Sequence, residues 1–216
     1  MFATGQPIFQ FRGPMGVPVE VHSSILFLVL IFLGFSSSPE DILYSAMFVA
    51  ILIGSIFLHE FGHAWGCHVQ GVPVRRVVIF GGGGFCEQGR SANREEQELI
   101  VAMGPIVNAA IWAIASLIWP VMEGGMAMWL VYVTAQINLF LCILNMLPVQ
   151  PLDGGKLFHL ALMRLMPPRD ATRVAGAVGV VIAVLWIPAM ILSFLTWGLV
   201  LFFIPSISAH WAMARV

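Results

Sequence analysis

Residues 42–58 read ILYSAMFVAILIGSIFL and run directly into HEFGH at residues 59–63. The first segment is long enough and apolar enough to cross a membrane, for which about 17 to 25 residues are needed. The second has the H-E-x-x-H pattern of a metal site on a helix. Ionisable side chains inside lipid cost about 2.5 to 3.5 kcal/mol each, so three of them in five positions require a bound ion or a function. The sequence therefore predicts a metal site within a membrane.

The spacing of the two histidines predicts that they share one ion. On an α-helix, residues four apart lie about 40° apart around the axis, so His59 and His63 would lie on one face. Glu60 is rotated by roughly 100° from His59, which suits a base that does not bind the metal. Beside a water activated by zinc, its carboxylate can take a proton and pass it to a leaving amine. The alternative is a chance pattern, expected in roughly one such chain in a hundred or two.

Composition predicts an all-α polytopic membrane protein. Hydrophobic residues make up 59% of the 216 positions and charged residues only 10%, with a mean hydropathy of +0.92. This balance favours a lipid environment over nucleic acid as a partner. About six transmembrane helices are expected, at residues 23–35, 42–65, 99–119, 128–147, 171–190 and 191–209. Pro188 either separates the last two or kinks one long helix. We expect no cleaved signal before the first span.

The basic residues predict the orientation. They precede the first span, follow the second and fourth, and follow the sixth: Arg12; Arg75, Arg76, Arg90 and Arg94; Lys156, Arg164, Arg169 and Arg173; Arg215. The connections on the opposite side carry no basic residue. The positive-inside rule therefore places both termini and the two larger loops in the cytoplasm.

Asp153 is the candidate for a third metal ligand. It follows the fourth span in the segment NMLPVQPLDGG at residues 145–155. His59 lies roughly 26 Å along its helix from the outer face, and Asp153 follows about 20 residues that run the same way, so both reach one depth. Two histidines and one carboxylate leave a fourth tetrahedral position for water, as catalytic zinc requires, although iron can use a similar set. Alternatively, this segment is a proline and glycine turn in which Asp153 caps a helix. Cys67, four residues after His63, is a weaker candidate ligand.

Residues 72–87 predict two short strands joined by a glycine turn, or a re-entrant segment, after the second span. The run VPVRRVVIF is followed by GGGG and FCE. Such a hairpin can simply cover the active site. It can also offer a strand edge to an unwound substrate, because main-chain pairing places little demand on substrate sequence.

At these motifs the chain resembles the site-2 protease family of intramembrane zinc metalloproteases. The resemblance covers about residues 50–160 and rests on HEFGH, on NMLPVQPLDGG, on the glycines after Phe80, and on GPIVN at residues 104–108, which looks like that family's Gly-Pro-x-x-Asn helix start. It implies that His59, His63 and Asp153 bind one Zn²⁺ ion, that Glu60 is the catalytic base, and that Asn145 holds the substrate. Gln150 departs from the usual Pro-x-Pro-Pro form.

The function expected from this resemblance is intramembrane proteolysis. We expect one metalloprotease domain over residues 1–216, with its catalytic core at about 42–160 and without a PDZ or CBS domain. Its substrate would be a transmembrane regulatory protein, cut near the cytoplasmic end of its span in a bacterial or archaeal cell membrane. The sequence predicts no oligomeric state. The main alternative is a membrane protein that binds or transports metal, although polar groups gathered at one depth and the absence of an evident repeat disfavour transport. A catalytically silent relative is disfavoured by the intact Glu60.

Overall fold

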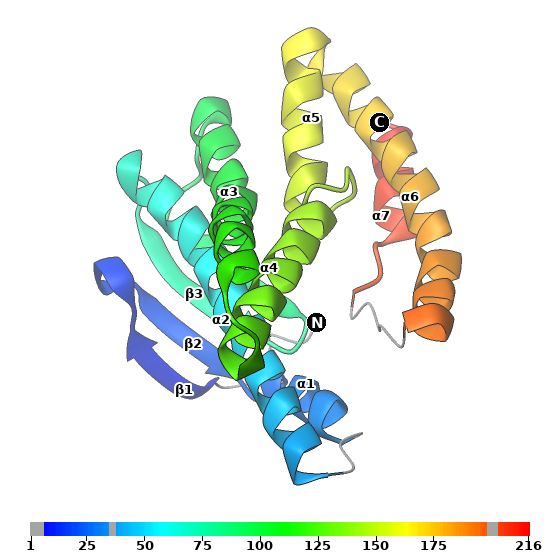
Figure 1. Cartoon of the computed structure of the whole chain (residues 1–216). Coiled ribbons are helices and arrows are strands. Elements are labelled where there is room, and N and C mark those ends of the chain that lie inside the picture. The colour runs from blue at the N-terminus through cyan, green and yellow to red at the C-terminus, as the bar shows by residue number, and fades with distance from the viewer. Residues whose placement is uncertain (1–6, 35–37, 198–202) are drawn as a thin grey trace. The chain divides into compact units, whose positions relative to one another are not determined.

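The computed structural model describes residues 7–34, 38–197 and 203–216, and the chain divides into two compact units between Cys142 and Ile143. The first unit holds a sheet and four helices, and the second holds three helices and the end of α4 (Figure 1). The elements of the first unit are β1 (Pro7–Arg12), a 3-10 turn (Pro14–Gly16), β2 (Pro18–His22), α1 (Ile25–Leu33), α2 (Pro39–Val69), β3 (Val74–Phe80), β4 (Gly83–Gln88), α3 (Arg94–Ile118), a second 3-10 turn (Trp119–Val121) and α4 (Gly125–Asn145). The second unit contains α5 (Asp153–Leu165), α6 (Pro168–Trp197) and α7 (Ile207–Ala214).

Within the described residues, four helices are long and apolar enough to cross a membrane: α2, α3, α4 and α6. The chain is therefore an integral membrane protein, and the part of it that the structure describes contains four such helices where about six were expected. The expected span at residues 23–35 contains the nine-residue helix α1, which is about 14 Å long and too short for a hydrocarbon core of about 30 Å. Residue 35 lies outside the described residues.

The two spans expected after residue 171 are not separated at Pro188. Helix α6 continues through this proline to Trp197, which membrane helices tolerate because neighbouring groups can satisfy the freed carbonyl. Residues 198–202 of the expected sixth span lie outside the described residues, and beyond them the short helix α7 follows.

The fold is mostly helical, as predicted, but the first unit contains a four-stranded sheet, in the order β1-β2-β3-β4, where only a short hairpin was expected. The expected hairpin after the second span is confirmed as β3 and β4. The sequence prediction missed β1 and β2, which form an antiparallel pair of their own. Strand β2 then runs parallel to β3, with Val19 opposite Val77.

This sheet packs against the part of α2 that carries the histidines. Val19, Val77 and Ile79 from the strands form one buried cluster with Phe61 and Ala64 of α2. Figure 1 shows the strands running beside this helix. Because Phe61 and Ala64 lie within and directly after the H-E-x-x-H segment, the sheet fixes the rotation of α2 about its axis there.

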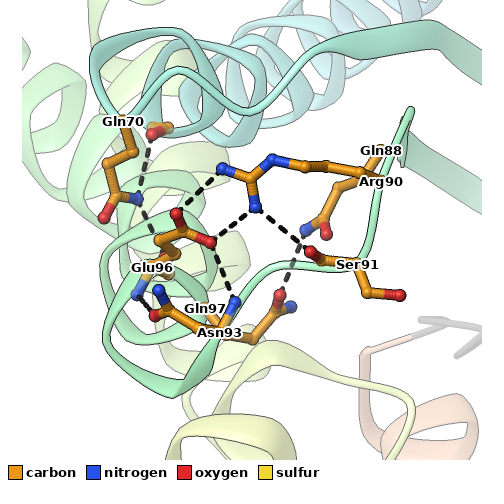
Figure 2. A network of polar contacts seen from close by, with 8 residues as sticks. Gln70, Gln88, Arg90, Ser91, Asn93, Glu96 and Gln97 are labelled. Atoms are coloured by element: carbon orange, nitrogen blue, oxygen red, sulfur yellow. Dashed lines mark hydrogen bonds and ion pairs between the residues drawn. The ribbon is translucent and has the colours of Figure 1, made fainter.

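The start of α3 is held by a network of polar contacts (Figure 2). Asn93 accepts from the backbone N–H of Glu96, and the Glu96 carboxylate accepts from the backbone N–H of Asn93, which is a capping box. Arg90 donates to both oxygens of the same carboxylate at 2.8 and 2.9 Å. Gln70, at the end of α2, donates to the carbonyls of Gly66 and Glu96. The network therefore joins the end of α2 to the beginning of α3.

In the second unit, the end of the chain returns to the beginning of α6. Arg169 and Arg173, in the first two turns of α6, both donate to the Val216 carbonyl, Arg173 at 2.5 Å. Helix α7 packs along α6 on this return path. The C-terminus of the chain is thereby placed beside the N-terminus of α6.

Candidate metal centre

His59 and His63 lie one helical turn apart on α2, and both side chains are buried. Their rings are nearly perpendicular, at 89°, and the two Nε2 atoms are 3.2 Å apart. Two nitrogens that bind one tetrahedral zinc at about 2.05 Å are separated by about 3.3 Å. The spacing of the pair therefore fits a shared ion.

The hydrogen bonds at the other ring nitrogens define the tautomers. His63 Nδ1 lies 2.8 Å from the Ile100 carbonyl, and a carbonyl can only accept, so Nδ1 carries the proton. His59 Nδ1 lies 2.6 Å from the amide oxygen of Asn108 and donates to it. In the neutral rings, each Nε2 then presents a lone pair to the other. Two lone pairs at this distance repel each other, and a cation between them converts repulsion into coordination. The donor set thus fits Zn²⁺.

A series of hydrogen bonds between buried polar residues extends from Nδ1 of His59. The Asn108 amide nitrogen donates to the Asn138 amide oxygen at 2.8 Å. Asn138 in turn donates to the Ser55 hydroxyl at 2.9 Å and to the Thr134 carbonyl at 2.9 Å. Asn108 and Asn138 are fully buried. These hydrogen bonds link α2, α3 and α4 and keep the amide oxygen of Asn108 directed toward His59.

Glycines bring α3 close enough to α2 for these contacts. A Cβ at Gly62 would lie 2.6 Å from the Met103 carbonyl oxygen, and one at Gly66 would lie 2.9 Å from Ile100 Cα. A Cβ at Gly104 would overlap the imidazole of His63 and lie 2.7 Å from His59 Cε1. Small residues at such positions allow close backbone packing between membrane helices.

The segment GPIVN does not begin a helix, contrary to expectation. It lies in the interior of α3, which begins at Arg94 and includes Pro105. Its position explains its composition instead, because Gly104 leaves space for the two imidazoles and Asn108, four residues later on the same face, contacts His59.

Glu60 is buried at 5% exposure beside strand β4. A Cβ at Gly84 would lie 2.6 Å from Glu60 Cγ and 2.9 Å from Oε1. The absence of a side chain at Gly84 therefore lets the backbone of β4 approach the carboxylate closely. Gly81, at the turn of the same hairpin, donates its N–H to the Ser24 hydroxyl at 3.1 Å, which anchors the hairpin.

Asp153 is the first residue of α5, and its side chain is buried. Lys156 Nζ lies 3.6 Å from its carboxylate, one helical turn further on. Asp153 lies in the second unit, whereas His59 and His63 lie in the first. Asn145 is the last residue of α4 and is partly buried.

Comparison with known proteins identifies the family. Residues 47–124 and 113–186 match the family model of Peptidase family M50, which together is more than half of the chain. The chain belongs to peptidase family M50.

Two curated relatives are similar to this M50 chain over most of its length. The zinc metalloprotease MJ0392 of Methanocaldococcus jannaschii is 25% identical over 182 residues, which are 83% of this chain and 52% of the relative. The Rip3 protein of Mycobacterium tuberculosis is 29% identical over 208 residues, which are 86% and 51% of the two chains. The M50 chain therefore spans about half the length of these relatives.

A solved structure has a similar fold. The site-2 protease from Methanocaldococcus jannaschii superposes with a TM-score of 0.67, at 22% identity, over 96% of this M50 chain and 92% of that protein. The polytopic membrane fold is therefore that of a site-2 protease.

Sequence reasoning missed several polar residues of this M50 chain that the structure places around the site. Asn138 and Ser55 each lie within an apolar span. A polar residue at such a position requires a partner, which is the signal that could have identified them. His210, in the second unit, was not among the predicted site residues either; it is 2% exposed and makes two hydrogen bonds.

Proposed function

We propose that the protein is an intramembrane zinc endopeptidase, which hydrolyses a peptide bond in or near the transmembrane segment of a regulatory membrane protein. One observation carries the proposal. Two buried imidazoles in a candidate membrane span, each with its Nδ1 hydrogen-bonded to an oxygen atom, bring their Nε2 atoms to 3.2 Å from each other. The membership in peptidase family M50 supports the same function.

The roles follow from the chemistry of each side chain. His59, His63 and Asp153 would bind the metal, leaving one tetrahedral position open. Bound zinc would polarise a carbonyl and lower the pKa of water. Glu60 would accept the proton of the attacking water and donate it to the leaving amine. Asn145, at the end of α4, would hold the substrate carbonyl through its side-chain amide.

Strand β4 is the proposed docking site for the substrate backbone. It is the last strand in the order of the sheet, so its outer edge has no strand beside it among the described residues. It also comes close to Glu60 at Gly84. An unwound substrate segment paired with this edge would therefore present its peptide bonds to the base.

We propose that both termini and the basic loops are cytoplasmic. The pairing of β2 with β3 supports a location of the N-terminal strands on the same side of the membrane as the segment after α2. That segment contains Arg75, Arg76 and Arg90. The hydrogen bonds of Arg169 and Arg173 to Val216 support a location of the C-terminus and the beginning of α6 on one common side of the membrane. Cleavage near this face would release a cytoplasmic factor. We place the protein in a bacterial or archaeal cell membrane, with residues 1–216 acting as one protease domain.

The test is cleavage of a panel of single-span membrane proteins by the purified chain in detergent, with bound zinc measured in each sample. Glu60→Gln should retain zinc and lose cleavage, since the amide cannot accept the proton. Glu123→Gln, a matched change of an exposed acid near the start of α4, should cleave like the wild type. Zinc bound by all three proteins with cleavage by none would favour the metal-binding or transport alternative, and cleavage by Glu60→Gln would contradict the role of the base.

A further inference from the structure

His210 of α7 uses both ring nitrogens inside the second unit. Its Nδ1 lies 2.7 Å from the Ser206 carbonyl oxygen and must donate to it. Its Nε2 is then unprotonated in the neutral ring and accepts the backbone N–H of Gln150 at 3.0 Å. The side chain is almost fully buried. His210 is therefore a fixed acceptor for one backbone group in the loop before Asp153.

The ring is held in place by glycines of α6. A Cβ at Gly179 would overlap the His210 imidazole, and one at Gly176 would overlap the backbone of α7 at Met213 and Ala214. Ser206 also caps α7 by accepting the N–H of Ala209 at 3.2 Å. Close packing on α6 and a capped helix start together restrict the position of the imidazole.

The loop that receives this hydrogen bond is in direct backbone contact with the first turn of α5. A Cβ at Gly155 would lie 2.6 Å from the Gln150 nitrogen, and one at Gly154 would overlap the Met146 carbonyl. Leu152 donates to the Val149 carbonyl at 3.1 Å, and Gly155 donates to the Leu152 carbonyl at 3.1 Å. A displacement of Gln150 would therefore move the beginning of α5, where Asp153 lies.

We propose that His210 is a positioning residue for Asp153: by accepting the Gln150 N–H, it fixes the loop and so the direction of the Asp153 carboxylate. This inference rests on the proposed function, in which Asp153 is a metal ligand. His210 does not touch the metal or the substrate in this role. Its effect is on how well the carboxylate is placed before the ion binds.

The experiment measures zinc affinity of the full chain in detergent by competition with a chelator. His210→Phe keeps an aromatic ring but removes the acceptor, and we expect it to weaken zinc binding by about tenfold, the lower end of the usual effect of residues that orient ligands. His210→Gln offers an amide oxygen at similar reach and should restore most of the affinity. Equal affinity in His210→Phe and the wild type would overturn the proposal, as would equal losses in the two variants.

Repeating the His210 substitution in a Gln150→Pro chain distinguishes the effect of the hydrogen bond from the effect of side-chain packing. Gln150→Pro removes the N–H itself, because proline has no backbone donor. In that background His210→Phe should change zinc affinity little, so the two changes would be strongly non-additive. The same loss in both backgrounds would show that His210 acts through packing alone and would overturn the proposal. If Gln150→Pro does not fold, the comparison of His210→Gln with His210→Phe decides.

Asp153→Asn distinguishes this inference from the function on which it rests. The variant should lose more zinc affinity than His210→Phe. Wild-type affinity in Asp153→Asn would remove Asp153 from the ligand set and so contradict the proposed function. Loss in Asp153→Asn without loss in His210→Phe would contradict the positioning role alone.

Discussion

The amide oxygen of Asn108 lies 2.6 Å from His59 Nδ1, while its amide nitrogen donates to Asn138. The second bond determines the first, because it leaves only the oxygen to face the ring. Asn108 thereby keeps the proton of His59 on Nδ1 and the lone pair on Nε2. A residue of α3 thus sets which nitrogen of an α2 residue is available to a metal.

Asn108→Leu should weaken zinc binding by about 10- to 100-fold, the range for groups that orient histidine ligands. The leucine has a similar size but offers no acceptor, so the His59 ring would no longer be held by Nδ1. Asn108→Asp, which keeps an acceptor at the same place, should bind zinc more tightly than Asn108→Leu. Chelator competition measures both, and equal affinities would contradict the role of the acceptor.

Gly104→Ala should abolish zinc retention while leaving the chain helical. The added Cβ would overlap the His63 imidazole, so the rings must turn away from each other's Nε2 atoms. Gly54→Ala on α2 is the matched control, because a Cβ there meets nothing within 4 Å. Metal analysis after purification, with circular dichroism for helix content, compares the two. Full zinc occupancy in Gly104→Ala would mean that the rings do not need their observed positions.

Gly84→Val should reduce peptide cleavage strongly while zinc remains bound. Its side chain would collide with the Glu60 carboxylate, and no histidine atom is among the three atoms nearest to a Cβ at this position. We therefore expect Gly84→Val to keep its zinc and lose cleavage, whereas Gly104→Ala should lose the zinc itself. Cleavage rate and zinc content are measured on the same sample. A variant that cleaves at the wild-type rate would show that Glu60 tolerates a displaced β4.

The ion pairs across the sheet predict a pH-dependent contribution to stability. The Arg76 guanidinium, 2.6 Å from the Glu87 carboxylate, and then Arg75 hold the pKa of Glu87 below its ordinary value of 4.5. Because the folded pKa is lower than the unfolded one, this contribution is fully present above about pH 4.5 and is lost as the pH falls through the folded pKa. The Tm of Glu87→Gln should therefore lie below that of the wild type at neutral pH, and the gap should narrow at about pH 4 and below. A gap that stays constant with pH would contradict this assignment.

The sequence predicted the histidine pair well and the sheet poorly, for physical reasons. Residues four apart on a helix share a face whatever surrounds them, so His59 and His63 followed from spacing alone. Strand β2 depends on a parallel partner far along the chain, and its short segment begins at Pro18 after a glycine and proline turn. No local periodicity indicates such a pairing. The apolar run before residue 35 has the composition of a membrane span, and only its helical length, nine residues, shows that it does not cross alone.

Asp153 illustrates a partial prediction. Counting residues along two spans predicts that it lies at the depth of His59, and the structure shows its side chain buried at the start of α5. The groups around it did not follow from the sequence. The acceptor for Gln150 comes from His210, 60 residues away, and no spacing rule connects two such positions.

The parallel pairing of β2 with β3 also has a consequence for the order in which the protein is made. Val19 leaves the ribosome about 60 residues before Val77, its partner, which at roughly 5 to 20 residues per second is a delay of about 3 to 12 s. During this interval β1 can pair with β2, but the other edge of β2 has no strand to pair with. The histidine helix α2 lies between the two strands in the sequence, so it must be synthesised before that edge can close. A nascent chain that stops before β3 would therefore carry an open strand edge on β2 that is available for aggregation.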